Sequence, residues 1–334
     1  GHQEAMKHTI CSALAALSLF TLSSCGKDTA AAGTGLAGNV LIDGSSTVLP
    51  ISEAAAEEFI GVEGGVNVTV GSSGTGGGFK KFVRSETDIN DASRPIKQKE
   101  IDAASKAGVE FLELPVAYDG IAVVVHKDNS FLDEISVEQL QKIWQSGSTV
   151  TNWKDVDASW PDEKIKLFAP GVDSGTFDYF TETVNGKSGN CRDDFTASED
   201  DHVLVQGVAG ERNSIGFFGF AYYAANKEKL KLLRVIGTNG AVAPSMETIA
   251  DGSYAPLSRP LFIYVSKKAY DSKPQVARFV EFYLDQVSVL AGEVGYVGLP
   301  ADVAAMVKAR LAQQKTGSMF AGGHGKSLVE ALKN

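Results

Sequence analysis

Three short segments combine hydroxyl side chains with glycine, and each lies where a strand is expected to lead into a helix. They are residues 43–47 (DGSST), 71–78 (GSSGTGGG) and 173–176 (DSGT). The first backbone N–H groups of a helix lack partners and carry positive partial charge, so such segments are suited to bind an anion. One segment alone is more simply explained as a helix cap, because Ser, Thr and Asp are the preferred capping residues. Three together predict an oxyanion site, provided that the fold brings them together.

A candidate for the positive charge of such a site is Arg94, within residues 91–95 (DASRP). A residue that precedes proline is held extended, so this loop would aim the side chain in a fixed direction. The guanidinium group offers a fork of donors that fits an oxyanion. The alternative for Arg94 is a salt bridge at the surface.

The motifs of common enzymes do not fit these segments. Phe79 separates the last glycine of the second segment from Lys80, so the P-loop pattern fails. Val172 stands where a nucleophilic-serine motif would need glycine, two residues before Ser174. Three histidines lie beyond residue 25, and none is in a recognisable catalytic motif: His126, His202 and His324. The sequence contains neither a zinc-binding pattern nor a dinucleotide-binding fingerprint. The sequence therefore favours binding over catalysis.

Composition narrows the class further. The 334 residues are 43% hydrophobic and 22% charged, which is typical of one large or two medium globular domains. Acidic residues outnumber basic ones by 41 to 31, which gives a net charge of −10. Nucleic-acid binding that rests on neutralising phosphates with Lys and Arg is thereby disfavoured.

Short apolar runs alternate with amphipathic stretches along the chain, a pattern that predicts an α/β fold with mainly parallel strands. Strands are expected at residues 39–42, 66–70, 120–125, 165–168, 215–218, 232–236 and 261–265. Helices are expected from residue 50, around 79–82, and at 99–107, 137–145, 176–184, 274–290 and 301–313. The three hydroxyl-rich segments follow strands, and the carboxyl ends of parallel strands are where α/β proteins bind ligands.

The N-terminus has the pattern of an exported lipoprotein. Residues 1–5 (GHQEA) precede Met6 as the remnant of an expression tag, and residues 6–24 read as a signal peptide. Its apolar run, 10–22, is shorter than the roughly 20 residues that span a bilayer. Residues 22–25 (LSSC) resemble a lipobox, so Cys25 is expected to carry lipid and 25–37 to form a tether. Cys191 is then left without a disulfide partner.

Five motifs, in order along the chain, resemble those of the PstS-type phosphate-binding proteins, the extracytoplasmic receptors of ATP-driven phosphate importers. They are residues 43–52 (DGSSTVLPIS), 70–82 (VGSSGTGGGFKKF), 88–96 (DINDASRPI), 170–180 (PGVDSGTFDYF) and 213–223 (NSIGFFGFAYY). The resemblance implies an α/β periplasmic-binding-protein fold of class II, in which two lobes are joined by crossover strands near 115–125 and 257–265. Each lobe would be a mixed sheet flanked by helices. Lobe 1 would hold residues 38–118 and 260–334, and lobe 2 would hold residues 119–259.

The resemblance also implies a set of phosphate ligands: Ser46, Thr47, the backbone of Val48, Ser72, Ser73, Ser93, Arg94, Ser174, Gly175 and Thr176. Two departures from the family stand out. Ser93 occupies a position where many members have a carboxylate that accepts the phosphate proton, and residues 170–172 lack the arginine that many members have there. Arg94 is expected to supply the charge instead. The proton acceptor is left open among Asp91, Asp119 and Asp173.

The function implied by the resemblance is to bind inorganic phosphate and deliver it to the permease subunits of an ABC transporter. The receptor would be a monomer without enzymatic activity or cofactor. It would be lipid-anchored in the periplasm or at the cell surface. Alternatives are the same fold binding sulfate or molybdate, a secreted phosphoester hydrolase, and an adhesive surface lipoprotein.

Overall fold

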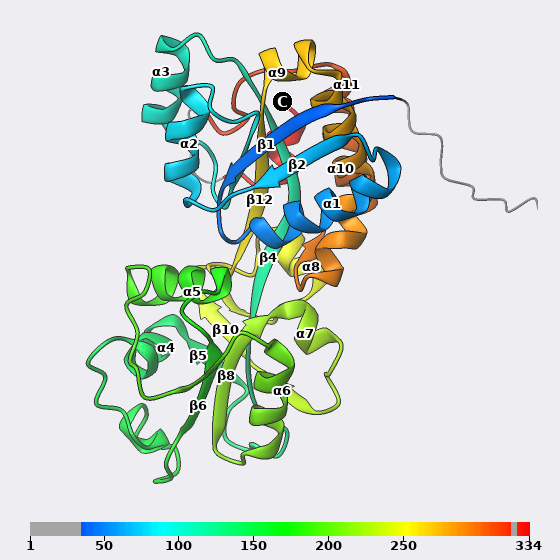
Figure 1. Cartoon of the computed structure of the whole chain (residues 1–334). Helices are drawn as coiled ribbons and strands as arrows, with labels where there is room; N and C mark the ends of the chain where they lie inside the picture. Colours follow the sequence, from blue (N-terminus) through cyan, green and yellow to red (C-terminus); the bar gives the residue numbers. More distant parts are fainter. Residues whose placement is uncertain (1–34, 322–325) are drawn as a thin grey trace, which may run out of the picture. The chain divides into compact units, whose positions relative to one another are not determined.

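The computed structural model describes residues 35–321 and 326–334, which belong to one compact unit of the chain. The expected tag remnant, the signal peptide, Cys25 and most of the tether lie outside the described residues. The prediction of an α/β fold is confirmed, since helices alternate with strands throughout the described part (Figure 1). In that part of the chain, no helix is both long and apolar enough to cross a membrane.

The first lobe is built on a sheet in the order β2–β1–β3–β12–β4, with β13 paired to β4 (Figure 1). Its strands are β1 (Gly38–Gly44), β2 (Val66–Val70), β3 (Ile89–Ala92), β4 (Phe111–His126), β12 (Ser258–Ser266) and β13 (Val297–Gly298). Its helices are α1 (Leu49–Val62), α2 (Thr75–Val83), α3 (Gln98–Lys106), α9 (Lys267–Ser272), α10 (Pro274–Glu293), α11 (Ala301–Ala312) and α12 (Leu328–Leu332). β1 runs parallel to β2 and β3, whereas β12 is antiparallel to both of its neighbours.

The second lobe continues from β4 in the order β4–β8–β6–β7 and carries a separate three-stranded sheet, β11–β10–β5. Its strands are β5 (Glu134–Ser136), β6 (Lys166–Pro170), β7 (Thr196–Ser198), β8 (Ser214–Gly219), β9 (Leu230–Leu232), β10 (Arg234–Gly237) and β11 (Gly240–Val242). Its helices are α4 (Val137–Trp144), α5 (Gly175–Asn185), α6 (Asp201–Gly210), α7 (Phe220–Ala224) and α8 (Met246–Ala250), with a 3₁₀ turn at Trp153–Asp155.

The chain passes between the two lobes through β4 and β12. Residues 111–120 of β4 pair with β12, and residues 121–125 pair with β8 in the second lobe. All but the last of the 16 residues of β4 are buried, which explains its nearly continuous apolar run. The apolar pattern predicts strand only at 120–125, because Glu113 and Asp119 interrupt the first half, whereas the family resemblance implies a crossover strand near 115–125.

Two further expectations need correction. The predicted strand at 232–236 is divided between β9 and β10, because the chain turns at Leu233, whose N–H donates to the carbonyl of Val123. The sheets are mixed, as the family resemblance implies, and not mainly parallel, as the alternation of helices and strands predicts, since β4 is antiparallel to β8, β9, β12 and β13. The antiparallel pairs could not be predicted from the alternation of helices and strands, because β12 returns from the second lobe and inserts between β3 and β4 in the first sheet.

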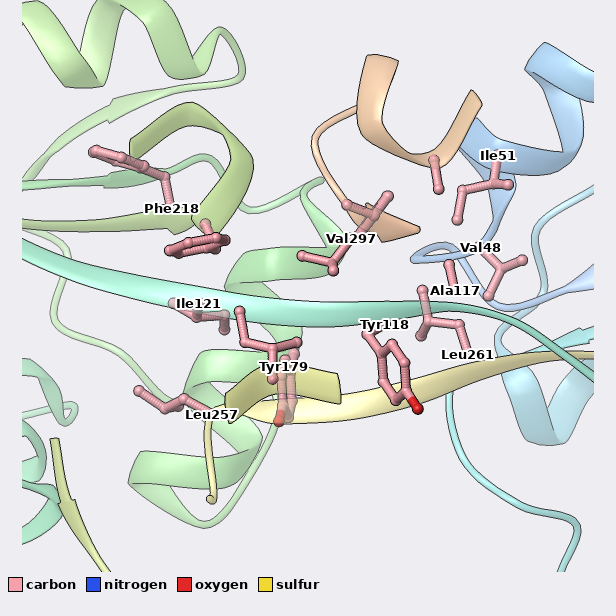
Figure 2. Packing of buried hydrophobic residues seen from close by; sticks show 14 of the residues in the cluster. Val48, Ile51, Ala117, Tyr118, Ile121, Tyr179, Phe218, Leu257, Leu261 and Val297 are labelled. Atoms are coloured by element: carbon pink, nitrogen blue, oxygen red, sulfur yellow. The ribbon is translucent and has the colours of Figure 1, made fainter. Parts of the chain in front are cut away.

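Each lobe has an apolar core that packs against β4 (Figure 2). In the first lobe, Phe59 of α1 packs against Phe279 and Phe282 of α10, with ring centroids 5.2 Å apart in both pairs. In the second lobe, Phe180 of α5 stacks on Phe217 of β8 at 3.7 Å. Burial of each large apolar side chain contributes about 1.5–3 kcal/mol, and these side chains belong to one continuous cluster that runs through both lobes.

Candidate functional site

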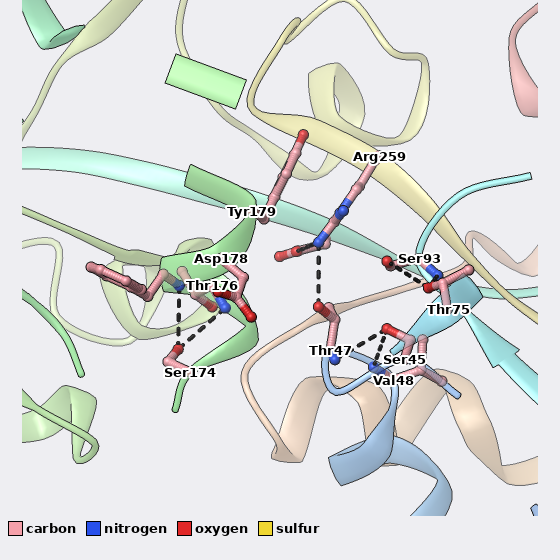
Figure 3. Close-up of polar contacts among 12 residues, drawn as sticks. Ser45, Thr47, Val48, Thr75, Ser93, Ser174, Thr176, Asp178, Tyr179 and Arg259 are labelled. Atoms are coloured by element: carbon pink, nitrogen blue, oxygen red, sulfur yellow. Dashed lines mark hydrogen bonds and ion pairs between the residues drawn. The ribbon is translucent and has the colours of Figure 1, made fainter. Parts of the chain in front are cut away.

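A cleft of about 540 Å³ lies between the lobes and is lined by hydroxyl groups and two arginines. The first lobe contributes Ser45, Ser46, Thr47, Gly74, Thr75, Ser93, Arg94 and Pro95. The second lobe contributes Asp178, Tyr179, Glu182, Thr183 and Ser188, and β12 contributes Arg259 and Pro260. Figure 3 shows many of these side chains converging from α5, β12 and the turn before α1. The composition suits a small, strongly hydrated anion.

The turn before α1 forms one wall of the cleft. The Ser45 hydroxyl accepts hydrogen bonds from the N–H groups of Thr47 (3.1 Å) and Val48 (3.4 Å), so it caps this turn (Figure 3). The N–H of Val48, an expected ligand contact, is thus engaged within the turn. Ser46 and Thr47 line the cleft, where the family resemblance placed them. A Cβ on Gly44, which has a φ of +133°, would meet the carbonyl of Asp91 at 2.2 Å, so this sharp turn requires glycine.

The second hydroxyl-rich segment contributes less than expected. Ser72 and Ser73 do not line the cleft. Ser73 donates instead to Asp43 through both its N–H and its hydroxyl, and Lys81 binds the same carboxylate at 2.7 Å. Burial raises the pKa of Asp43, but the hydrogen bonds from Lys81 and Ser73 outweigh it and hold that pKa below its usual value. These residues therefore fix the turn, while Thr75 reaches the cleft.

Thr75 and Ser93 form a linked pair of hydroxyls on this wall. Their oxygens lie 3.1 Å apart, and the N–H of Ser93 donates to the Thr75 oxygen at 3.1 Å (Figure 3). Each hydroxyl can both donate and accept a hydrogen bond, so the pair can adapt to a protonated or an unprotonated ligand oxygen. Ser93 therefore lies at the cleft as expected, although without the carboxylate that many family members have there.

The third segment meets the first across the cleft. Ser174 caps α5 by accepting from the N–H groups of Thr176 (3.2 Å) and Phe177 (3.5 Å). A Cβ on Gly175 would lie 2.6 Å from the Thr47 hydroxyl and 2.7 Å from its Cα, so the two turns are in contact. Residues 43–47 and 173–176 therefore touch, but Ser174, Gly175 and Thr176 do not line the cleft, and their role as ligand contacts stays a prediction. Farther along α5, Asp178, Tyr179 and Glu182 line the cleft.

Arg94 lies at the cleft, but its charge is already paired. Its two terminal nitrogens donate to the Glu100 carboxylate at 2.8 and 2.9 Å, and one of them also donates to the carbonyl of Pro95. Burial raises the pKa of Glu100, and the bonds from Arg94 more than reverse this. Arg94 therefore forms a salt bridge with Glu100, which was the alternative interpretation of this residue. Arg94 thus lines the cleft with its charge shared with Glu100, and its role as the positive charge of the site stays a prediction.

A second arginine, Arg259, lies at the cleft between the two lobes, and it was not among the residues predicted from the sequence. It lies in β12, and its Nη2 is 3.3 Å from the Thr47 hydroxyl and 3.5 Å from the Asp119 carboxylate (Figure 3). Its guanidinium carbon stacks 3.7 Å from the ring centre of Tyr179 in α5. Arg259 therefore contacts the first lobe, the second lobe and the other crossover strand. Residues 258–260 repeat the Ser-Arg-Pro sequence of residues 93–95, and this repeat was the available signal.

None of the three candidate proton acceptors lines the cleft. Asp91 is fully buried in the first lobe, where it accepts from Ser52 at 3.0 Å, and burial raises its pKa well above the usual value. Asp119 is 1% exposed and lies beside Arg259; burial raises its pKa and Arg259 lowers it, with burial prevailing. Asp173 is exposed on the loop before α5.

The carboxylates that do line the cleft are Asp178 and Glu182, one turn apart on α5. One oxygen of Asp178 accepts from the Ser188 hydroxyl at 2.8 Å. Neither residue was a candidate in the sequence, because both lie beyond the hydroxyl-rich segment on an ordinary amphipathic helix. Among the described residues, no group of three His, Cys, Asp or Glu side chains is placed to hold a metal ion.

Comparison with known proteins agrees with this fold. The model of a family described as the PBP superfamily domain matches residues 29–287, and the chain belongs to this superfamily of binding proteins. Within it, the chain belongs with the PstS-like phosphate-binding proteins, and the resemblance noted in the sequence is confirmed.

Two relatives and one solved structure illustrate this membership of the PstS-like proteins. Protein SphX of Synechococcus elongatus is 51% identical over 87% of this chain and 85% of its own length. Phosphate-binding protein PstS of Staphylococcus saprophyticus is 43% identical over 79% of this chain and 81% of its own. A crystal structure described as a possible phosphate binding protein from Planctomyces limnophilus superimposes with a TM-score of 0.80 and 46% identity. It covers 83% of this chain and 99% of the other.

Proposed function

We propose that this chain binds inorganic phosphate in the cleft between its lobes and passes it to the permease of an ABC importer. The observation that carries the proposal is the position of Arg259, whose guanidinium contacts the Thr47 hydroxyl of the first lobe and the Tyr179 ring of the second, in a cleft lined by hydroxyl groups. A guanidinium beside hydroxyl donors recognises an oxyanion by charge and by hydrogen bonds together. The names of the relatives, which are those of binding proteins and not of enzymes, support the same reading.

In this proposal, the phosphate oxygens are bound by Arg259 and by hydroxyls of the two lobes. Ser46 and Thr47 donate from the turn before α1, and Thr75 and Ser93 donate from the neighbouring wall. From the second lobe, Ser174, Gly175 and Thr176 present the N-terminus of α5, whose positive partial charge favours an anion. A ligand that contacts both lobes holds them together, which is the signal that a permease would read.

Selection of phosphate over sulfate is assigned to Asp178 and Glu182. Hydrogen phosphate carries a proton that it can donate, whereas sulfate at neutral pH carries none. A carboxylate at the cleft can accept that proton, but beside sulfate it would be a negative charge facing an anion without a partner. The Asp178 oxygen that does not bind Ser188 is free for this role among the described contacts.

The same proposal places the protein outside the cytoplasm. Residues 6–24 act as the signal peptide, and Cys25 carries the lipid that holds the receptor on the membrane through the tether. One lipid-modified cysteine holds the protein near the permease without a spanning helix. Metabolic labelling with a fatty acid in cells that express the wild type or Cys25→Ala tests this part; label on the wild type alone is the expected result.

Calorimetric titration tests the ligand directly. Protein comprising residues 38–334 is first stripped of bound phosphate, and is then titrated with phosphate, sulfate and molybdate. We expect saturable 1:1 binding of phosphate with little heat from sulfate. Stronger binding of sulfate or molybdate than of phosphate would identify that anion as the ligand. Release of free phosphate from a model phosphoester would instead support a hydrolase.

A further inference from the structure

On one edge of β4, a strand from each lobe is placed end to end. The other edge is occupied by β12, and Ile121 donates its N–H on that side to Leu257. The remaining edge pairs first with β13 of the first lobe, where Val297 is opposite Tyr118. It then pairs with β8 of the second lobe, where Gly219 is opposite Ile121. Only residues 119 and 120 separate the two pairings on this edge, and they pair with β12 alone, at Arg259 and Ser258, so a bend between the lobes is easiest there.

The end of β8 and the start of β13 are in contact through two glycines, Gly219 and Gly295. A Cβ on Gly219, at the end of β8, would lie 2.7 Å from the carbonyl oxygen of Gly295, just before β13. A Cβ on Gly295 would lie 2.4 Å from the ring of Tyr222 in α7. The backbones of the two lobes therefore touch here with no room for a methyl group. Val297 and Phe218, which flank the contact, lie on the same side of β4 in Figure 2.

This contact lies next to the residues of the cleft. Tyr296, which follows Gly295, is buried and close enough to Asp119 and Arg259 to sense their charges; burial above all, and then Asp119, raise its pKa. In the same arrangement of the lobes, Gly175 touches Thr47 across the cleft. The contact at Gly219 and the contact that closes the cleft therefore occur together.

We propose that the contact between Gly219 and Gly295 is a stop that sets how far the lobes rotate about residues 119–120. The inference rests on the proposed function, because it makes phosphate affinity depend on a residue outside the cleft. Any side chain at Gly219 would collide with the Gly295 carbonyl in the arrangement that brings Thr47 to Gly175. The lobes would then have to part, and the walls of the phosphate site would separate.

The variant Gly219→Ala tests this stop. The backbone of Gly219 has φ −54° and ψ 136°, which any residue adopts, so the methyl group acts through the contact and not through backbone strain. We expect phosphate affinity to fall at least about tenfold, which corresponds to ~1.4 kcal/mol. We also expect a larger radius of gyration by X-ray scattering in saturating phosphate. The matched control is Gly292→Ala in α10, where an added Cβ meets nothing within 4 Å.

A second pair of variants covers the case in which Gly219→Ala does not fold. Tyr222→Ala removes the ring that covers Gly295, so the lobes can rotate past the angle at which Thr47 meets Gly175, and phosphate binding is expected to weaken. The neighbouring Tyr223→Ala is expected to leave phosphate binding unchanged. Affinities of Gly219→Ala and Tyr222→Ala within twofold of wild type, or tighter, would overturn the stop. If the wild type bound no phosphate, the proposed function would fail. X-ray scattering of unliganded Gly219→Ala would still test the stop. A radius of gyration equal to that of the unliganded wild type would contradict the stop.

Discussion

Arg259 of β12 and Asp119 of β4 are directly opposite one another in the register of the two crossover strands, and their side chains form a buried ion pair of 3.5 Å. Both oxygens of Asp119 and the Nε of Arg259 have no hydrogen-bond partner among the described residues. A buried pair with so few hydrogen bonds contributes little to stability, because desolvation offsets the attraction. Its position at the hinge and at the cleft points instead to a role in binding and in orienting Arg259.

The stacking of Tyr179 on Arg259 should contribute to phosphate affinity. Tyr179→Leu removes the aromatic face, and a cation–π contact of about 0.5–2 kcal/mol predicts weakening of roughly 2- to 30-fold. Tyr179→Phe keeps the ring and loses only the hydrogen bond of its hydroxyl to the carbonyl of Pro256. Isothermal calorimetry should therefore rank wild type, Tyr179→Phe and Tyr179→Leu in that order. Equal affinities for the Phe and Leu variants would show that the stacking does not matter.

The contact of Gly175 with Thr47 should tolerate no side chain. Gly175→Ala is expected to preserve α5, since alanine favours helices, but to weaken phosphate binding by about tenfold or more, because its methyl group meets the Thr47 backbone. Gly210→Ala at the end of α6 is the matched control, because an added Cβ there meets nothing within 4 Å. Circular dichroism and calorimetry on both proteins separate folding from binding. Wild-type affinity in Gly175→Ala would show that the lobes need not meet at this point.

The carboxylates of α5 should determine selectivity more than affinity for anions in general. In Asp178→Asn, the charge that repels sulfate is removed and the ratio of phosphate to sulfate affinity is expected to fall. Glu182→Gln, one turn away, tests whether the second carboxylate shares the role. Competition of sulfate against phosphate at pH 8 gives the ratio for each variant. A ratio that neither variant changes would assign proton recognition to another group.

The buried carboxyl of Asp91 predicts a dependence of stability on pH. Burial raises its folded-state pKa well above 3.8, so the folded protein holds this proton more tightly than the unfolded chain does. Its contribution to the free energy of unfolding is complete below the unfolded-state pKa, and is lost as pH rises through the folded-state pKa. Urea unfolding from pH 4 upward should show a steeper decline for wild type than for Asp91→Asn. Parallel curves for the two proteins would contradict the prediction.

Much of the site could be predicted because local chemistry recurs in the sequence. Thr47 and Gly175 belong to hydroxyl-rich turns between strand and helix, and such turns carry their capping pattern within a few residues. Ser73 shows the limit of that signal, since its hydroxyl serves Asp43 and not the cleft. A cap and a ligand contact use the same residue types, and only the direction of the side chain separates them.

The assignment of the positive charge could not be made from local sequence. Arg94 and Arg259 both stand in Ser-Arg-Pro, yet a glutamate six residues away takes the charge of Arg94. Arg259 reaches the cleft because β12 returns to pair with β4, a contact between residues 140 positions apart. The apolar pattern alone does not predict the start of β4 for a related reason, because Glu113 is buried there through hydrogen bonds from Tyr264, Ser318 and Met319.

The most direct test of the account compares two double variants, each of which removes one ion pair and leaves the net charge unchanged. Arg259→Ala/Asp119→Ala removes the pair at the hinge, and Arg94→Ala/Glu100→Ala removes the pair at the rim of the cleft. Phosphate affinity is measured by calorimetry after both proteins are shown to be folded. Loss of a charge-assisted contact of up to about 3 kcal/mol predicts roughly 100-fold weaker binding for the first variant, and little change for the second. Near-wild-type affinity in the first variant, with binding lost in the second, would contradict the assignment of Arg259 as the charge that holds phosphate.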